Sequence, residues 1–131
     1  MNVKLLLLNF YFIFSLIFGI LINTTFSNLV NISGLYLYSF FATIPLFILQ
    51  FVSIAQFSRK IKKSNPKLFN QACLRPNGTK GSSINVASLF DDSIPFSKIK
   101  EESMIKDWNY TKRVIIYSML SFAVLIILFF I

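Results

Sequence analysis

Apolar residues along this chain gather in three long runs, which cover residues 5–22, 35–57 and 114–131. The runs contain 18, 23 and 18 residues. A transmembrane helix needs about 20 predominantly apolar residues to cross a hydrocarbon core about 30 Å thick. The pattern therefore predicts an all-α integral membrane protein with three transmembrane helices.

The distribution of charge favours the same interpretation. The 54 residues between Lys4 and Arg59 include no charged side chain, and one ionised group at the bilayer centre would cost about 2.5–3.5 kcal/mol. A cleaved signal peptide is the alternative for the first run, because Lys4 precedes it. That run is longer than the usual apolar core of about 7–15 residues, and no small-residue cleavage site follows Ile22. We therefore expect the first span to be retained.

Composition and hydropathy together define three segments. The chain is 55% hydrophobic with 16 phenylalanines and a mean hydropathy of +0.66, which excludes an ordinary soluble domain of this length. We expect a transmembrane hairpin at residues 1–57, a basic loop at 58–113 and a C-terminal transmembrane helix at 114–131. The sequence contains no internal repeat.

Local signals refine this division. The segment 23–34 is short and uncharged, so the first two spans should form an antiparallel hairpin. Asn65-Pro66 is expected to end a helix that continues from the second span, because a residue before proline disfavours the α conformation. A short helix is expected from Ser93 through Lys106.

Basic residues predict the orientation. Twelve of the 13 lysines and arginines lie in 59–113, and none lies in 23–34. The positive-inside rule therefore places the N-terminus and the basic loop in the cytoplasm and the C-terminus outside. The expected contacts with anionic lipid headgroups come from Arg59, Lys60, Lys62, Lys63, Lys112 and Arg113. Lipid, and not nucleic acid, is thus the expected partner of the net charge of +8.

Residues that carry chemistry are scarce. The sequence has no histidine, which removes the usual general base and the commonest metal ligand. Cys73 is the single cysteine, and the acidic residues form adjacent pairs at 91–92 and 101–102, where neighbours do not face each other on a helix. We therefore expect no catalytic residue, no cofactor and no metal site, and we do not expect an enzyme.

Polar side chains within the spans form two stripes on a helical projection. The second span carries Ser39, Thr43, Gln50 and Ser53 on one stripe, and the first span carries Asn9 and Ser15 on another. Gly19 lies on the same arc as Ser15, in a small-xxx-small spacing. Because lipid offers polar groups no partners, both stripes should contact another helix. Either these two spans pack on each other, or Gln50 or Asn9 belongs to a surface that recognises a partner protein. Pro45 is expected to kink the second span.

A recognisable layout covers residues 50–131. It comprises a span, a basic helical extension, the sequence Asn65-Pro66-Lys67-Leu68-Phe69, a polar loop, Lys112-Arg113 and a terminal span. This layout resembles the universal stress protein B family of small bacterial inner-membrane proteins, and Pro-x-Leu-Phe is similar to that family's Pro-Leu-Leu-Tyr. The chain departs from the family by its additional N-terminal span. The resemblance implies a stress-related protein of the bacterial inner membrane.

The overall type is also similar to the three-span immunity proteins that protect producers of colicins and microcins. Such proteins need no catalytic residues, because they engage a toxin or its receptor within the bilayer. We therefore expect a function in helix–helix association, with bacteriocin immunity as the leading hypothesis. A stress-related role, a holin and an accessory subunit of a membrane complex are the alternatives.

Overall fold

The computed structural model describes residues 2–26 and 33–131, and within these residues the fold is helical without a β-strand. An isolated antiparallel bridge joins Leu74 and Lys80. Three described helices are long and apolar enough to cross a membrane, and they cover Val3–Thr25, Gly34–Ser64 and Glu102–Phe130. The predicted all-α membrane protein with three transmembrane helices is therefore confirmed.

The described helical elements follow one another with few interruptions. In chain order they are α1 (Val3–Leu21), η1 (Ile22–Phe26), α2 (Gly34–Tyr38), η2 (Ser39–Thr43), α3 (Ile44–Ser64), α4 (Pro66–Ala72), η3 (Val86–Phe90), η4 (Phe96–Lys98) and α5 (Glu102–Phe130). Elements η1 and η2 are π-helical turns, whereas η3 and η4 are 3-10 turns.

Helix α1 and its continuation η1 exceed the first apolar run at both ends. The side chain of Asn2 caps the N-terminus by accepting a hydrogen bond from the N–H of Leu5 at 3.3 Å. Residues 23–26, which we expected to belong to a turn, continue the helix. The centre of the expected turn, residues 27–32, lies outside the described residues.

The second span is one continuous helical stretch built from α2, η2 and α3. The π-helical turn of η2 ends two residues before Pro45. Proline has no N–H, so the carbonyl of Phe41, four residues earlier, lacks its α-helical donor. The hydroxyl of Tyr11 on α1 donates a hydrogen bond to that carbonyl. A neighbouring helix therefore satisfies the acceptor that the proline leaves free.

The segment predicted to be a loop contains one confirmed helix boundary and one wrong prediction. Helix α3 ends at Ser64, and Asn65 caps α4 by accepting from the N–H of Leu68 at 3.1 Å, so the predicted stop is confirmed. The predicted helix at 93–106 is wrong. The Ser93 N–H is bound by the Asp91 carboxylate at 2.9 Å, only a 3-10 turn follows, and α5 begins at Glu102.

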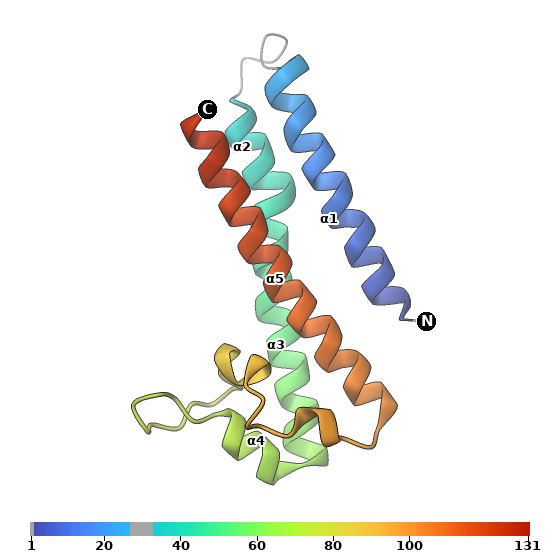
Figure 1. Ribbon diagram of the computed structural model, residues 1–131, viewed down its shortest axis with the longest axis vertical. Coiled ribbons are helices and arrows are strands. Elements are labelled where there is room, and N and C mark those ends of the chain that lie inside the picture. The colour runs from blue at the N-terminus through green and yellow to red at the C-terminus, as the bar shows by residue number, and fades with distance from the viewer. Residues whose placement is uncertain (1, 27–32) are drawn as a thin grey trace. The chain divides into compact units, whose positions relative to one another are not determined.

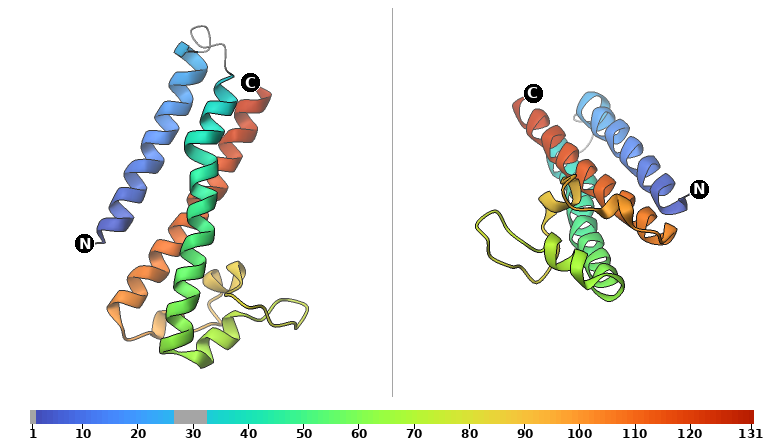
Figure 2. Two further views of the ribbon diagram at one scale, coloured as in Figure 1. Left: turned by 180° about the vertical axis from the view of Figure 1, so that it is seen from behind. Right: turned by 60° about the horizontal axis from the view of Figure 1, so that its bottom comes forward.

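The chain forms two compact units. One comprises residues 1–50 and 114–131, and the other comprises residues 51–113. In the first unit, α1, the stretch from α2 into α3, and the C-terminal part of α5 lie side by side (Figure 1; Figure 2). The stretch from α2 into α3 runs antiparallel to both of the other helices. The end of η1, the start of α2 and the end of α5 consequently lie at the same end of this unit (Figure 1).

The second unit, which contains most of the basic residues, has its own apolar core. Phe96 is fully buried and packs between Phe57 and Trp108, with ring centroids 5.8 Å apart in both pairs. The indole N–H of Trp108 donates to the carbonyl of Leu89 at 3.1 Å. The other buried apolar side chains of this core include Ile61, Leu68, Phe69, Ala72, Cys73, Ile84 and Met104. The predicted loop is thus a folded unit that includes the adjoining ends of α3 and α5.

Candidate functional site

A buried polar seam, defined as Thr43, Gln50, Ser118 and Ser121, lies inside the first unit. The hydroxyls of Thr43 and Ser121 are 3.1 Å apart and share a hydrogen bond. The Ser118 hydroxyl donates a hydrogen bond to the side-chain oxygen of Gln50. Ser121 also bonds to the hydroxyl of the fully buried Tyr38, at 3.2 Å. The seam therefore joins the second span to the third.

Helix α1 joins the same unit through contacts of its own. The hydroxyl of Tyr117 on α5 donates to the side-chain oxygen of Asn9 at 2.7 Å. The Tyr117 ring stacks on Phe12, with ring centroids 4.1 Å apart and an interplanar angle of 5°. Asn9 therefore contacts the third span. Its polar group is used within the protein.

The remaining residues of the first-span stripe face inward. Gly19 lies against the ring of Tyr38, so that an added Cβ would be only 2.8 Å from a ring carbon. Ser15 is buried, and its hydroxyl donates to the carbonyl of Phe12 in its own helix at 2.7 Å. Gly19 thus provides a close approach between α1 and α2, as small residues do in membrane interfaces.

The second-span stripe divides between the two units. Thr43 and Gln50 hydrogen-bond to the third span in the first unit. The first span packs on the second through other residues, such as Gly19 against Tyr38. Ser53 belongs to the second unit, where it is buried and lies close to the hydroxyl of Tyr110 of α5. Ser39 is half-buried and is not among the described residues that bond to α5.

Sequence reasoning missed the partners on α5, which are Tyr117, Ser118 and Ser121. A signal was present, because these three are the polar residues of the third apolar run. Ser118 and Ser121 also continue a 3-4 spacing that starts at Thr111 and Val114, both of which are buried. On the facing helix, Thr43, Leu46 and Gln50 follow the same spacing. Such spacing is typical of left-handed helix packing.

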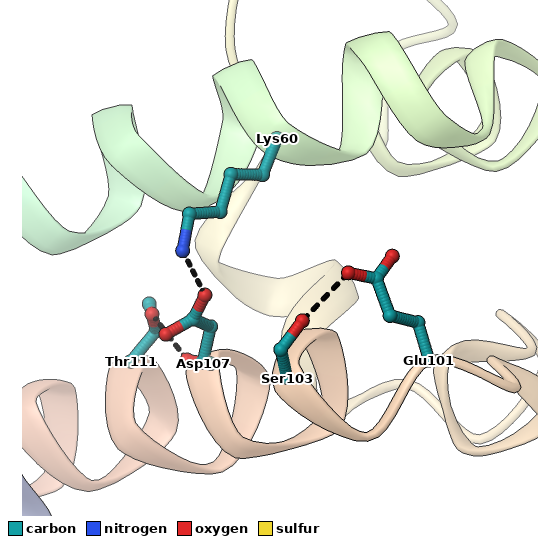
Figure 3. A network of polar contacts seen from close by, with 5 residues as sticks. All are labelled: Lys60, Glu101, Ser103, Asp107 and Thr111. Atoms are coloured by element: carbon teal, nitrogen blue, oxygen red, sulfur yellow. Dashed lines mark hydrogen bonds and ion pairs between the residues drawn. The ribbon is translucent and has the colours of Figure 1, made fainter.

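The candidate lipid contacts differ in what they already bind within the second unit. Lys60 forms an ion pair with Asp107, and the Thr111 hydroxyl donates to the Asp107 carbonyl at 2.8 Å (Figure 3). The ammonium group of Lys112 lies 3.6 Å from the centroid of the Trp108 ring, a cation–π contact. Nearby on the chain, the hydroxyl of Ser103 donates to Glu101 at 2.6 Å (Figure 3).

The other candidate lipid contacts are exposed on α3 and α5, and they are Arg59, Lys62, Lys63 and Arg113. The Lys62 ammonium group lies 5.8 Å from the centroid of the Phe69 ring. Arg59 and Lys62 line a pocket of about 190 Å³ together with serines of the 82–83 loop. Lys60 thus contacts a carboxylate, Lys112 and Lys62 contact aromatic rings, and Arg59 borders the pocket.

The thiol of Cys73 and the carboxyl group of Asp91 lie outside the seam. Among the described residues, no three His, Cys, Asp or Glu side chains lie close enough to hold a metal ion. Cys73 is buried, and burial raises the pKa of its thiol while the charges of Lys80 and Lys62 oppose this shift. Hydrogen bonds from Ser93 hold the pKa of the exposed Asp91 carboxyl below its usual value. The seam consists of hydroxyl groups and an amide, and these groups form hydrogen bonds that join two helices.

A comparison with known protein families finds no match for this chain, and searches among curated proteins and solved structures also find none.

Proposed function

We propose that this protein acts in the bacterial inner membrane by associating with another membrane-active protein, and that its role is immunity to a bacteriocin. The observation that supports this proposal is that the polar groups of the seam bond to one another within the protein. Gln50 and Thr43 bond to Ser118 and Ser121, and no buried side-chain polar atom among the described residues lacks a partner. The spans thus form a pre-assembled helical body.

The surface available to a partner is therefore the outer face of that body. On α1 this face is apolar and aromatic, with Phe10 and Phe14 exposed by 64% and 70%. A protein that engages a pore-forming toxin within the bilayer needs such a face and no catalytic group. The absence of histidine from the sequence favours association over catalysis in the same way.

The proposed orientation places the N-terminus and the 59–113 segment in the cytoplasm. Support comes from the twelve basic residues of that segment against none in 23–34. The end of η1 and the end of α5 also lie at one end of the first unit, as this orientation requires (Figure 1). Reporter fusions after Thr25, after Gly81 and at Ile131 should report outside, inside and outside. An outside signal at Gly81 would overturn the orientation.

The functional test is the survival of sensitive cells that express the protein. We expect the wild type to protect against one toxin, encoded by a neighbouring gene, and to give no protection against unrelated colicins. Replacing Phe10 and Phe14 by alanine should reduce protection while the protein remains in the membrane. The matched control replaces Ile126 and Ile127, which are exposed by 44% and 57% on α5.

Two results would reject the immunity hypothesis. One is the lack of protection against the product of any neighbouring toxin gene, and the other is the lack of such a gene. A stress-related role would then lead, on the resemblance of residues 50–131 to the universal stress protein B family. That role predicts a growth defect of the deletion strain under stress, restored by the wild-type gene.

A further inference from the structure

We propose that the pocket beside α3 binds the phosphate group of an anionic membrane phospholipid. The pocket has a volume of about 190 Å³ and lies entirely within the second unit. Its lining includes two cations, Arg59 and Lys62, and two serines, Ser82 and Ser83. None of the described residues that line it is acidic. A site with cationic and hydroxyl donors and no carboxylate suits a phosphate ester.

The pocket is formed by a loop that is held against α3. Ser58 of α3 is buried, and its hydroxyl accepts a hydrogen bond from the N–H of Ile84 at 3.1 Å. This bond fixes the residues immediately before Ile84, which are Ser82 and Ser83. The exposed serines are thereby kept in the lining of the same pocket as Arg59 and Lys62.

The position of the cations along α3 identifies a lipid as the source of the phosphate. The apolar run ends at Phe57, and at 1.5 Å per residue Arg59 and Lys62 lie about 3 Å and about 7.5 Å beyond it. A bilayer about 40–45 Å thick with a core of about 30 Å has headgroup layers of about 5–8 Å. Both cations therefore lie at headgroup depth.

The same face of α3 continues toward the hydrocarbon core in apolar residues. Val52, Ala55, Arg59 and Lys62 follow a 3-4-3 spacing, which places them on one stripe. Ala55 lines the pocket and is exposed, and Val52 is 43% exposed. A small side chain between the cations and the valine leaves a path for an acyl chain. The apolar end of the stripe thus matches the acyl chains of a phospholipid, and the cationic end matches its phosphate group.

Lys60 and Lys112 are less suited to this role. Lys60 is paired with Asp107, and the Lys112 ammonium group lies 3.6 Å from the centroid of the Trp108 ring, closer than the 5.8 Å between Lys62 and Phe69. Arg59 and Lys62 have no carboxylate partner among the described residues, since the ion pairs there use other cations. The site is independent of bacteriocin immunity and requires only that the second span crosses a membrane.

The test measures lipid binding to the purified full-length protein in detergent by native mass spectrometry. Phosphatidylglycerol should bind more tightly than phosphatidylcholine. Arg59→Gln with Lys62→Gln should weaken phosphatidylglycerol binding about 30-fold, or about fivefold for each charge removed. The matched control, Lys67→Gln with Lys98→Gln, removes two exposed charges outside the pocket and should change binding less than twofold.

Two further arms separate a site from general attraction and a lipid from free phosphate. Ala55→Leu fills the acyl path at an exposed position without changing charge, and it should weaken phosphatidylglycerol binding severalfold. Inorganic phosphate at millimolar concentration should compete only weakly. The proposal is overturned if the control variant weakens binding as much as the pocket variant, if Ala55→Leu has no effect, or if phosphate binds and phosphatidylglycerol does not displace it.

Discussion

Replacing Gly19 by alanine tests how closely α1 packs in the first unit. The added Cβ would lie 2.8 Å from Cδ2 and 2.9 Å from Cε2 of Tyr38. The Tyr38 ring has no room to retreat freely, because it is fully buried and its hydroxyl bonds to Ser121 at 3.2 Å. Any movement of the ring therefore disturbs the polar seam as well.

Two effects of this substitution oppose each other. Alanine favours a helix over glycine by up to about 1 kcal/mol. Overpacking a filled interior costs about 1–3 kcal/mol. Restoring ordinary contact at 3.4 Å requires the distance of 2.8 Å between the Cβ and the ring to increase by about 0.6 Å. Because the ring is held by its burial and by its hydrogen bond to Ser121, we expect overpacking to exceed the gain in helix propensity, with a net loss of up to about 2 kcal/mol.

The assay is reversible unfolding in mixed micelles, followed by circular dichroism as sodium dodecyl sulfate increases. Ile20→Ala is the matched control, since Ile20 neighbours Gly19 on α1 but is 63% exposed, and it should cost less than about 0.5 kcal/mol. In a Tyr38→Val background, Gly19→Ala should lose most of its cost. A stabilised Gly19→Ala protein, or an equal cost in both backgrounds, would refute the packing argument.

Three further predictions concern the seam and the second unit. Gln50→Leu removes the bond to Ser118 and should cost about 0.6–2 kcal/mol in the same unfolding assay while leaving partial protection against a toxin; complete loss of protection in a fully stable protein would show that Gln50 contacts a partner. Lys60→Gln breaks the ion pair with Asp107, whose lysine is 52% exposed, and should cost about 0.2–1 kcal/mol; a cost that persists in about 1 M salt would contradict a surface pair. Burial raises the pKa of the Cys73 thiol. The neutral thiol therefore stabilises the folded protein below the ordinary thiol pKa, and this stabilisation declines as pH rises through the folded pKa. Maleimide should modify the folded protein more slowly than the unfolded chain, and equal rates would contradict burial.

Hydropathy was sufficient to predict the three spans but not their full helical lengths. The third apolar run begins at Val114, whereas α5 begins at Glu102. Residues between these positions are mostly charged and polar, and they continue the helix because the apolar residues among them pack in the second unit. Trp108 and Met104, for example, contact or join the core around Phe96. Hydropathy indicates whether lipid or water surrounds a segment. It does not predict how far a helix continues beyond its apolar run.

The helical projection predicted an inward face and left its partner open. Thr43 and Gln50 lie on the expected stripe. A helical projection gives the direction in which a residue faces, but it does not identify the helix that this face contacts. The answer depends on the donors of the third span, Ser118 and Ser121. The fold of residues 66–101 was less predictable still, since contacts such as Ser58 with Ile84 join residues 26 positions apart.

The central claim is that the polar seam holds the second span against the third within a membrane. Cysteines at positions 43 and 121, introduced as Thr43→Cys and Ser121→Cys in a Cys73→Ser background, test it most directly by oxidative cross-linking in native membranes. The two native hydroxyls are 3.1 Å apart, so we predict rapid disulfide formation within one chain. The control pair Ile44→Cys with Ser121→Cys places one thiol on an exposed face and should cross-link poorly. Equal cross-linking of both pairs, or none at 43 and 121, would contradict the claim.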